Sequence, residues 1–296
     1  MLSAYRTLGK EVAMAETVGI VGAGFMGSGI AESAARGGYD VILHEPDAAV
    51  LARSRSRIEQ SLSRAAEAGK LEGASAESVL ARITPATELA AVSGAQLIVE
   101  AVYEDAQVKA AVFRELDRLL PPEIPLASNT SSIPIARLAA ATAHPERVLG
   151  IHFFSPVPVM RLVEVVISLD TASEIVERAE RFVVAIGKQS IRTKDRSGFV
   201  VNLLLVPYLM AAVRMLEEGF ASAEDIDLGM KLGAGHPMGP LTLCDFIGLD
   251  VLHAVCDSLY EEFKRPDFAA PPLLKRLVEA GHHGRKSGRG FYDYAG

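Results

Sequence analysis

The stretch TVGIVGAGFMGSGIAESAARGG, residues 17–38, decides the fold of this chain. It opens with Thr17–Val21, an apolar run typical of a buried strand, and it closes with a helical pattern that ends at a glycine pair. Between them GAGFMG, residues 22–27, fits the pattern G-x-G-x-x-G at a strand-to-helix turn. There the first glycine permits a tight turn, the second lets a pyrophosphate approach the backbone, and the third lets helix and strand pack closely. We therefore predict a dinucleotide site at the start of this helix, with a plain glycine turn as the alternative.

Glu45 stands at the end of the second predicted strand, residues 41–44, after the glycine loop. An acidic side chain at this place accepts hydrogen bonds from a ribose 2′-hydroxyl and repels a 2′-phosphate. The sequence therefore predicts NAD rather than NADP, although His44 lies beside the carboxylate and a surface glutamate without a ligand is the alternative. The residues predicted to contact the cofactor here are Gly22, Gly24, Phe25, Met26, Gly27 and Glu45.

Apolar runs and helical patterns alternate through the first two thirds of the chain, which predicts a mostly parallel sheet with crossover helices. Near Thr193 the pattern becomes helical, with a capping box from Ser222 and a glycine and proline break at GAGHPMGP. We therefore predict a Rossmann-type α/β domain over residues 14–195 and an all-helical domain over residues 196–296. The other predicted elements are strands at 41–44, 96–102, 125–127, Val148–Phe153 and Leu162–Ile167, a helix from Asp47 and a helix over 107–119.

The composition is that of an ordinary globular protein, with 49% hydrophobic and 23% charged residues among 296. The formal net charge of -7 argues against a protein that holds nucleic-acid phosphates, so small molecules are the expected partners. The two cysteines, Cys244 and Cys256, have no paired spacing, and no histidine cluster of the zinc-site type accompanies them. We therefore predict no metal site, reduced thiols and a cytoplasmic location.

Two segments of the chain bear on targeting and on membrane insertion. Residues 1–13 lack the long apolar segment of a secretory signal, and we interpret them as an extension. Residues 199–216 have the length of a membrane span, but they contain Asn202, Pro207 and Arg214. A buried helix is therefore favoured over a membrane span.

The stretch GIHFFSPVPVMRLVEVV, residues 150–166, places a histidine and a glutamate among apolar residues, where unpaired charges are costly. Oxidation of an alcohol with NAD needs a base for the hydroxyl proton, and histidine titrates near neutral pH. His152 at a predicted strand end is the candidate base, and Glu164 is the carboxylate that would orient it. Pro156 and Pro158 force a turn, so the two residues are expected on neighbouring strands. A buried histidine bonded only to structure is the alternative.

Small polar side chains follow another predicted strand in ASNTSS, residues 127–132, at the same edge of the sheet. Asn202 lies just inside the apolar helix of the second domain, where a buried amide needs partners. If that helix lies across the cleft, Ser131 and Asn202 would hold oxygen atoms of a substrate. The alternative for the serines is a helix cap, since Ser132 precedes the helical pattern IPIARLAAA.

Several separated motifs resemble, in their order, the NAD-dependent L-3-hydroxyacyl-CoA dehydrogenase family, in particular its short 3-hydroxybutyryl-CoA dehydrogenases. They run from Thr17 to Tyr294 as GAGFMGSGIAE, EAVYEDAQVK, ASNTSS, HFFSPVPV, LVEVV, SGFVVN, KLGAGHPMGP and GRKSGRGFY. An ordered set of this kind is far more specific than one glycine loop. The resemblance implies reversible NAD-dependent oxidation of a short-chain (S)-3-hydroxyacyl-CoA to the 3-ketoacyl-CoA.

The resemblance also implies a role for each matching residue. His152 matches the base of the family, and Glu164 matches the acid paired with that base. Ser131 and Asn202 match residues that hold the substrate near the base. The positions that match cofactor contacts, near the nicotinamide or near the C-terminus, are Glu104, Lys109, Ser131 and Lys286.

Two positions depart from the family pattern. Ser155 follows HFF where the family usually has asparagine, and this shorter donor would contact the nicotinamide amide less well. Ser61 matches a serine that holds coenzyme A in the family, but Ala68 replaces the lysine seven residues later. Lys70 or a nearby arginine is a candidate substitute.

The helix after Glu45 has an apolar and a basic face by its periodicity. A solvated face is the plain interpretation of the basic stripe, and contact with coenzyme A phosphates is the alternative that the family implies. The apolar face holds Leu51, Ile58, Leu62 and Ala65, and the opposite face holds Arg53, Arg57 and Arg64.

Two other functions stay open beside the acyl-CoA dehydrogenase. One is a related dehydrogenase of a free hydroxy acid or sugar acid such as L-gulonate, which the alanine at position 68 favours. The other is a non-catalytic NAD-binding structural protein. The resemblance also implies a homodimer through the helical domain, whose apolar helices over 199–216 and 251–263 exceed what one small domain buries.

Overall fold

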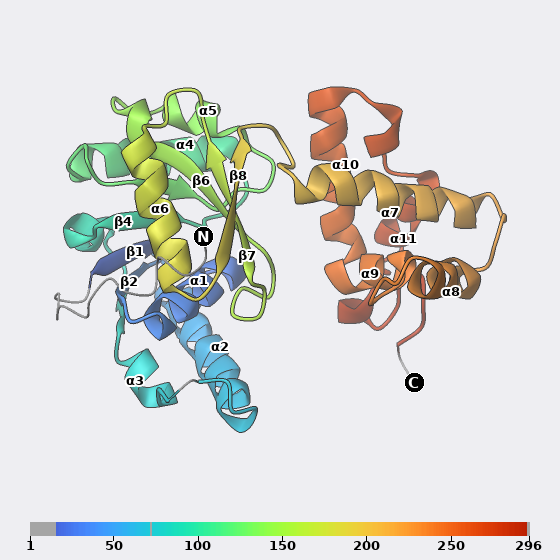
Figure 1. The fold of residues 1–296 in the computed structure, drawn as a ribbon, viewed down its shortest axis with the longest axis horizontal. Helices are drawn as coiled ribbons and strands as arrows, with labels where there is room; N and C mark the ends of the chain where they lie inside the picture. Colours follow the sequence, from blue (N-terminus) through green and yellow to red (C-terminus); the bar gives the residue numbers. More distant parts are fainter. Residues whose placement is uncertain (1–15, 72, 295–296) are drawn as a thin grey trace. The chain divides into compact units, whose positions relative to one another are not determined.

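The computed structural model describes residues 16–71 and 73–294 of the chain (Figure 1). It divides into two compact units, of which the first ends at Asp195 and the second begins at Arg196. The interpretation of residues 1–13 as an extension concerns residues outside those described.

In the described part of the first unit, eight strands form a single sheet. They are β1 (Thr17–Val21), β2 (Asp40–His44), β3 (Ile83–Ala86), β4 (Leu97–Glu100), β5 (Leu126–Ser128), β6 (Val148–Phe153), β7 (Leu162–Ile167) and β8 (Gln189–Lys194). Their order in the sheet is β3-β2-β1-β4-β5-β6-β7-β8, and Figure 1 shows the blue β1 and β2 and the yellow β8. The pairs from β3 to β6 are parallel, β7 runs antiparallel to β6, and β8 runs parallel to β7.

The predicted mostly parallel sheet is confirmed, but the sequence analysis missed β3 and β8. Both are edge strands of the sheet, so neither needs an apolar run on two faces. In β3 the residues Thr84 and Pro85 are exposed, and β8 mixes exposed and half-buried residues along QSIRTK without strict alternation. Periodicity therefore carried little signal for either strand.

The helices of the first unit pack on this sheet with buried apolar faces. They are α1 (Phe25–Arg36), α2 (Ala48–Glu67), α3 (Ala76–Leu80), α4 (Ala106–Leu119), α5 (Ile135–Ala139) and α6 (Ser173–Ala185), with short 3-10 turns η2 (Leu89–Gly94) and η3 (Pro145–Arg147). One core cluster joins α1, α2, α3 and α6 to the strands, with Ile30, Leu62 and Phe182 at its centre. Asp47 and Asp105 cap the starts of α2 and α4 through backbone amides, which explains where these helices begin.

The described part of the second unit has helices and turns and no strand of a sheet. Its elements are α7 (Val201–Glu217), α8 (Ala223–Gly233), α9 (Pro240–Ile247), α10 (Leu249–Phe263), α11 (Pro272–Glu279), and the 3-10 turns η4 (Pro266–Phe268) and η5 (Arg285–Ser287). The predicted helix over 199–216 is α7, whose Leu209 and Val213 are buried in the core of the unit. The cap at Ser222 is confirmed, because its side chain accepts a hydrogen bond from the amide of Asp225. Within residues 16–71 and 73–294, no helix combines the length and the apolar character needed to cross a membrane.

Two buried aspartates explain the glycine-rich motifs of the second unit. Asp227 accepts hydrogen bonds from the amides of Leu241 and Thr242 at the start of α9. A Cβ on Gly239 would collide with the side chain of Asp227, so only glycine fits at the last position of the segment GHPMG. Residues 234–239 accordingly leave the helical conformation, and α9 begins at Pro240.

Asp245 plays the same part for the motif GRKSGRGFY. Its carboxylate accepts hydrogen bonds from the amides of Phe291 and Tyr292 at 2.9 and 3.0 Å, and from the hydroxyl of Tyr294 at 3.0 Å. A Cβ on Gly290 would collide with this carboxylate. The last part of the described chain is therefore fastened to α9 by one buried aspartate.

Asp245→Ala should lower the free energy of unfolding by about 3 kcal/mol, because two buried amides and a hydroxyl lose a charged acceptor. Urea unfolding followed by circular dichroism measures the change. Asp257→Ala is the control, since Asp257 is exposed and pairs only with His253, and its effect should stay within about 0.5 kcal/mol. Equal effects of the two variants would show that Asp245 does not fasten the C-terminal motif.

Candidate active site

The three glycines of the loop between β1 and α1 have different surroundings. Gly22 has φ 104°, and a Cβ there would lie 2.6 Å from the carbonyl oxygen of Ala101. A Cβ on Gly27 would collide with the carbonyl oxygen of Gly22. A Cβ on Gly24, in contrast, would meet no atom of the described residues within 4 Å. The packing of the protein thus requires two glycines, and the space beside Gly24 is open to a ligand.

The amino end of α1 faces this open space with its backbone amides. Among the described residues no side chain caps α1, and its first turn holds no acidic residue. Glu45 follows β2 and accepts hydrogen bonds from the amides of Ala23 at 3.2 Å and Asp47 at 3.4 Å. An uncapped helix start attracts phosphate, and a carboxylate beside it accepts from ribose hydroxyls. The loop and Glu45 together fit a dinucleotide such as NAD.

His152 and Glu164 face each other across β6 and β7. They are register partners in the antiparallel pair, and Nδ1 of His152 lies 2.7 Å from Oε2 of Glu164. Glu164 is fully buried and His152 is 6% exposed. With Glu164 ionised, Nδ1 carries the proton and donates it, so Nε2 is the basic nitrogen of the ring. The predicted placement on neighbouring strands is confirmed, and the catalytic role stays a prediction.

A polar cluster brings together Glu104, Lys109 and Ser131, which the sequence analysis had assigned to the cofactor. One oxygen of Glu104 accepts hydrogen bonds from the Thr130 hydroxyl at 2.5 Å, the Ser131 amide at 3.1 Å and the Ser132 hydroxyl at 3.1 Å. Its other oxygen lies 3.3 Å from Nζ of Lys109. Burial opposes ionisation of Glu104, but the Lys109 charge and these donors hold the pKa of its carboxyl below the usual value.

The sequence analysis missed Glu100 and Asn129, which belong to the same edge of the sheet. Glu100 is the last residue of β4 and accepts a hydrogen bond from Nζ of Lys109 at 2.6 Å. The side-chain oxygen of Asn129 accepts a hydrogen bond from the amide of Phe153 at 2.9 Å, which joins the ASNTSS segment to β6 beside His152. For Glu100 the sequence did hold a signal, which is the single charge at the end of the apolar run LIVE. A charge at the end of a buried strand needs a partner.

The cap reading of Ser132 is wrong. The amides of Ile135 and Ala136 at the start of α5 donate to the carboxylate of Asp195, at 2.8 and 2.7 Å. Ser132 instead donates to Glu104. The carboxylate that caps α5 comes from sixty positions along the chain, so local sequence could not indicate it.

Comparison with protein-family models matches the whole described fold. Residues 17–196 match the NAD-binding domain of 3-hydroxyacyl-CoA dehydrogenase, and residues 198–294 match the C-terminal domain of the same enzyme. The chain belongs to the 3-hydroxyacyl-CoA dehydrogenase family. Its first unit is accordingly an NAD-binding domain of the Rossmann type.

Close relatives within the 3-hydroxyacyl-CoA dehydrogenase family cover nearly the full chain. A 3-hydroxybutyryl-CoA dehydrogenase of Mycobacterium tuberculosis is 53% identical over 281 residues, which are 94% of this chain and 98% of the relative. The crystal structure of FadB2 from M. tuberculosis matches with a TM-score of 0.92 and 54% identity, covering 94% of this chain and 98% of that one. The (S)-3-hydroxybutyryl-CoA dehydrogenase PaaH1 from Ralstonia eutropha matches with a TM-score of 0.89 and 41% identity, over 95% of this chain and 100% of that one.

Helix α2 carries Ser61 and ends at Ala68, the two positions that the sequence analysis connected with coenzyme A. Ser61 is half-buried and lies beside Glu32. Burial raises the pKa of the Glu32 carboxyl, and the hydrogen bond from Ser61 opposes that rise. Ala68, which replaces the family lysine, is the residue at which α2 ends. Ser155 is exposed directly after β6.

One arginine of the predicted basic stripe lies elsewhere. Arg53 and Arg64 are exposed, as predicted, but Arg57 is half-buried and turned towards α1. Its guanidinium donates to the hydroxyl of Ser28 at 2.9 Å and to the carbonyl of Gly24 at 3.5 Å. The plain interpretation of a fully solvated face is therefore wrong for Arg57, although the three arginines lie on one continuous helix.

Two predicted site residues of this dehydrogenase belong to the second unit. Asn202 lies in the first turn of α7 and is half-buried. Lys286 lies in η5, and its Nζ donates to the carboxylate of Asp250 at 2.7 Å.

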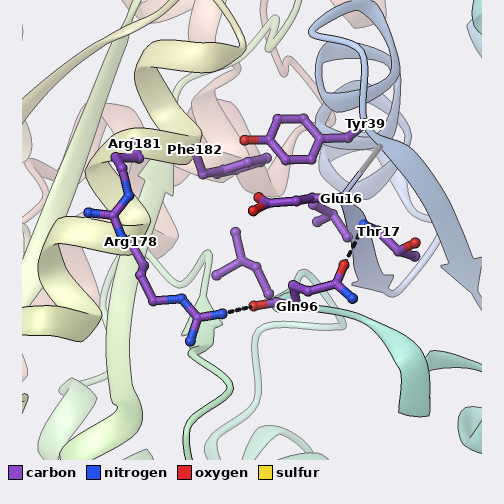
Figure 2. A pocket seen from close by; sticks show the side chains of 9 residues that line it. Glu16, Thr17, Tyr39, Gln96, Arg178, Arg181 and Phe182 are labelled. Carbon is purple, nitrogen blue, oxygen red and sulfur yellow. Dashed lines mark hydrogen bonds between the residues drawn. The ribbon is translucent and has the colours of Figure 1, made fainter. Parts of the chain in front are cut away.

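A polar pocket at the other edge of the sheet takes no part in this site. Figure 2 shows it at the amino ends of β1 and β4, where Gln96 accepts from the amide of Thr17 and from the guanidinium of Arg178. Tyr39 and Glu16 also line it. The glycine loop and His152 lie at the carboxyl ends of parallel strands, which is the opposite edge.

Gly24→Ala and Gly27→Ala should separate ligand binding from packing in the glycine loop. In Gly24→Ala the backbone, with φ -65°, accepts alanine, but the methyl group fills the open space, so the Kd of NADH should rise about tenfold with little change in melting temperature. Gly27→Ala should lower stability by about 1–3 kcal/mol. Fluorescence titration with NADH and thermal melting measure both effects, and an unchanged Kd in Gly24→Ala would remove the cofactor from this space.

Proposed function

We propose that the protein reversibly oxidises short-chain (S)-3-hydroxyacyl-CoA, of the 3-hydroxybutyryl-CoA type, to 3-ketoacyl-CoA with NAD. The observation that carries the proposal is the buried pair of His152 and Glu164, 2.7 Å apart, on β6 and β7 of the sheet whose β1 leads into the dinucleotide loop. NAD, when bound, accepts the hydride from C3 of the substrate. The helical second unit would supply substrate contacts and the dimer contact.

His152 is the proposed general base. Its Nδ1 is committed to Glu164, so Nε2 takes the hydroxyl proton during oxidation and returns it during reduction. The low exposure of the ring keeps bulk water from this nitrogen.

Glu164 is the proposed orienting acid. Because it is fully buried beside the imidazole, its negative charge stabilises the imidazolium that forms after proton transfer. The same hydrogen bond fixes the tautomer of His152. The antiparallel register of β6 and β7 holds both side chains on one face of the sheet, so little reorganisation accompanies the transfer.

The remaining polar residues would bind and orient the reactants. We assign Ser131 and Asn202 to the oxygen atoms of the substrate, and Glu104 and Lys109 to the nicotinamide end of the cofactor. For Ser131, Glu104 and Lys109 the support is their shared cluster at the carboxyl ends of β4 and β5, together with the family match. For Asn202 the support is the family match of the second unit. Further cofactor contacts are assigned to Ser155 and Lys286, and a coenzyme A contact to Ser61.

The residues beside the ribose position favour NAD over NADP. Glu45 presents a carboxylate there, and a 2′-phosphate would be repelled. Burial lowers the pKa of His44 below its usual value, despite the nearby charge of Glu45, so this ring is neutral at pH 7. A neutral His44 does not offset the repulsion.

One rival activity has a specific observation in its favour. The helix α2 ends at Ala68 without the lysine that the family uses for coenzyme A, which fits a dehydrogenase of a free hydroxy acid or sugar acid. A non-catalytic NAD-binding protein is disfavoured, because a bare nucleotide site has no use for a buried imidazole braced by a carboxylate. We also propose a cytoplasmic location, supported by two buried cysteines that are both free.

With acetoacetyl-CoA the purified protein should consume NADH, and His152→Ala should lower kcat on the order of 10²–10⁴-fold. Glu164→Gln should act in the same direction because it loses the charge that stabilises the imidazolium. The decrease of NADH absorbance at pH 7 measures both rates.

His144→Ala is the matched control, because His144 also contacts a carboxylate, that of Asp117, but lies away from the site. It should keep the wild-type rate. Free acetoacetate and L-gulonate test the rival activity, and faster turnover of either than of acetoacetyl-CoA would replace the proposed substrate. Wild-type turnover in His152→Ala would remove the histidine from the mechanism.

We further propose that the second unit forms a homodimer. Large apolar side chains stand exposed on it, among them Leu204 on α7 and Leu232 on α8, at 73% and 78% exposure. Exposed apolar groups of this size are typical of a contact surface.

Sedimentation at micromolar concentration should therefore give twice the chain mass of 31.6 kDa. Leu232→Glu should shift the population to the monomer, since a buried carboxylate would oppose association. Leu169→Glu, on a 90% exposed residue of the first unit, is the control and should leave the dimer intact. A wild-type protein that sediments only as the monomer contradicts the proposal.

A further inference from the structure

Glu100 is a fully buried carboxylate with a complete set of donors. Its first oxygen accepts hydrogen bonds from Nζ of Lys109 at 2.6 Å and from the amide of Val102 at 2.7 Å. Its second oxygen accepts from the hydroxyl of Ser128 at 2.7 Å. Burial raises the pKa of Glu100, and these donors with the Lys109 charge oppose that rise. An apolar residue could fill the end of β4 without this desolvation cost. The presence of a carboxylate there therefore needs a physical explanation.

Lys109 connects this carboxylate to a second one. The ammonium group is 1% exposed and lies 2.6 Å from Glu100 and 3.3 Å from Glu104. A buried cation between two carboxylates takes its position from both of them. If Glu100 lost its charge, the attraction would be one-sided and Lys109 would move towards Glu104.

Glu104 in turn holds the ASNTSS segment by three donors, which come from Thr130, Ser131 and Ser132. Glu100 reaches the same segment by a second route. The hydroxyl of Ser128 donates to Glu100 and accepts from the amide of Thr130 at 3.2 Å. The segment is thus fixed at both ends by charges that meet at Glu100.

We propose that Glu100 is a positioning residue, which sets the place of Ser131 through Lys109 and Glu104 and through Ser128. The proposal rests on the proposed function for its catalytic consequence, because Ser131 is there assigned to the substrate. Glu100 itself touches no reactant. Its role is to keep the hydroxyl of Ser131 in place near β6, to which the same segment is joined by the hydrogen bond from the amide of Phe153 to Asn129.

Glu100→Gln keeps the size of the side chain and removes its charge. Lys109 is then drawn to Glu104, and the Glu104 carboxylate loses part of its hydrogen bonding to the ASNTSS segment. The kcat for acetoacetyl-CoA should fall roughly 10- to 100-fold, as for a displacement of about 1 Å at a reacting group. Amide hydrogen exchange of residues 130–132 should become faster, because the Thr130 and Ser131 amides lose acceptors that are held in place.

A double-mutant cycle with Thr130→Val identifies the route. Thr130→Val removes the hydroxyl that donates to Glu104. If Glu100 acts through this contact, the double variant should be no more than about twofold slower than the slower single variant. Independent effects would instead multiply, and that result would overturn the proposal.

Asp117→Asn is the matched control. Asp117 lies on the same helix α4 and forms its own buried ion pair with Arg147 at 2.7 Å, away from the ASNTSS segment. This variant should lose stability, yet keep the wild-type kcat and the wild-type exchange of residues 130–132. If it changed both as much as Glu100→Gln does, the effect would be general loosening of the fold and the proposal would be wrong.

The exchange measurement separates this proposal from the proposed function. If the wild-type protein turns over no acyl-CoA, the proposed function fails, and faster exchange in Glu100→Gln alone still supports the positioning role. Exchange at the wild-type rate in Glu100→Gln contradicts that role, whatever the activity. Should Glu100→Gln not fold, Glu100→Asp retains the charge at a greater distance from Lys109, and the same cycle with Thr130→Val applies.

Discussion

Buried carboxylates that accept hydrogen bonds from distant segments hold the parts of this protein together. Glu100, Glu164, Asp227 and Asp245 are each at most 5% exposed, and each joins segments that are distant in the sequence. A carboxylate is tolerated in such a place only when its lone pairs meet donors, so each one fixes the orientation of the groups around it. Because these charged contacts are directional and apolar packing is not, they limit the freedom of the surrounding backbone. A reacting site needs such fixed positions.

The sheet turns this constraint into a site. Parallel strands β1 to β6 bring their carboxyl ends to one edge, where the glycine loop, Glu100 and the ASNTSS segment meet. The change of direction between β6 and β7 places Glu164 opposite His152 instead of one crossover away. A histidine and its carboxylate can therefore sit twelve residues apart in the chain and 2.7 Å apart in space. The geometry of the pair is a consequence of strand register rather than of any loop.

Local patterns predicted the parts of the protein that local forces determine. The glycine loop, the buried strands and the neighbouring positions of His152 and Glu164 followed from periodicity and turn residues. The edge strands β3 and β8 were not predicted because at least half of their residues are polar or exposed. The cap of α5 was not predicted because Asp195, distant in the sequence, reaches it through the tertiary fold. The contacts of Arg57 escaped prediction because helical phase could not reveal that Ser28 and Gly24 offer acceptors nearby. Glu100 escaped for a similar reason, since its partners come from α4 and β5.

The difference between these two groups of residues also explains how the site can vary within one fold. The base and its acid depend on two adjacent strands, so the proton transfer survives changes in the helices around it. The segment that carries Ser131 is held by Glu104, whose other oxygen lies beside Lys109, and α2, to which we assign the coenzyme A contact, ends at Ala68. Substitutions in those contacts change the position of a donor without touching the proton acceptor. Under the proposed function, substrate preference can therefore change through α2 and the ASNTSS segment, while the imidazole and its carboxylate keep the proton transfer constant.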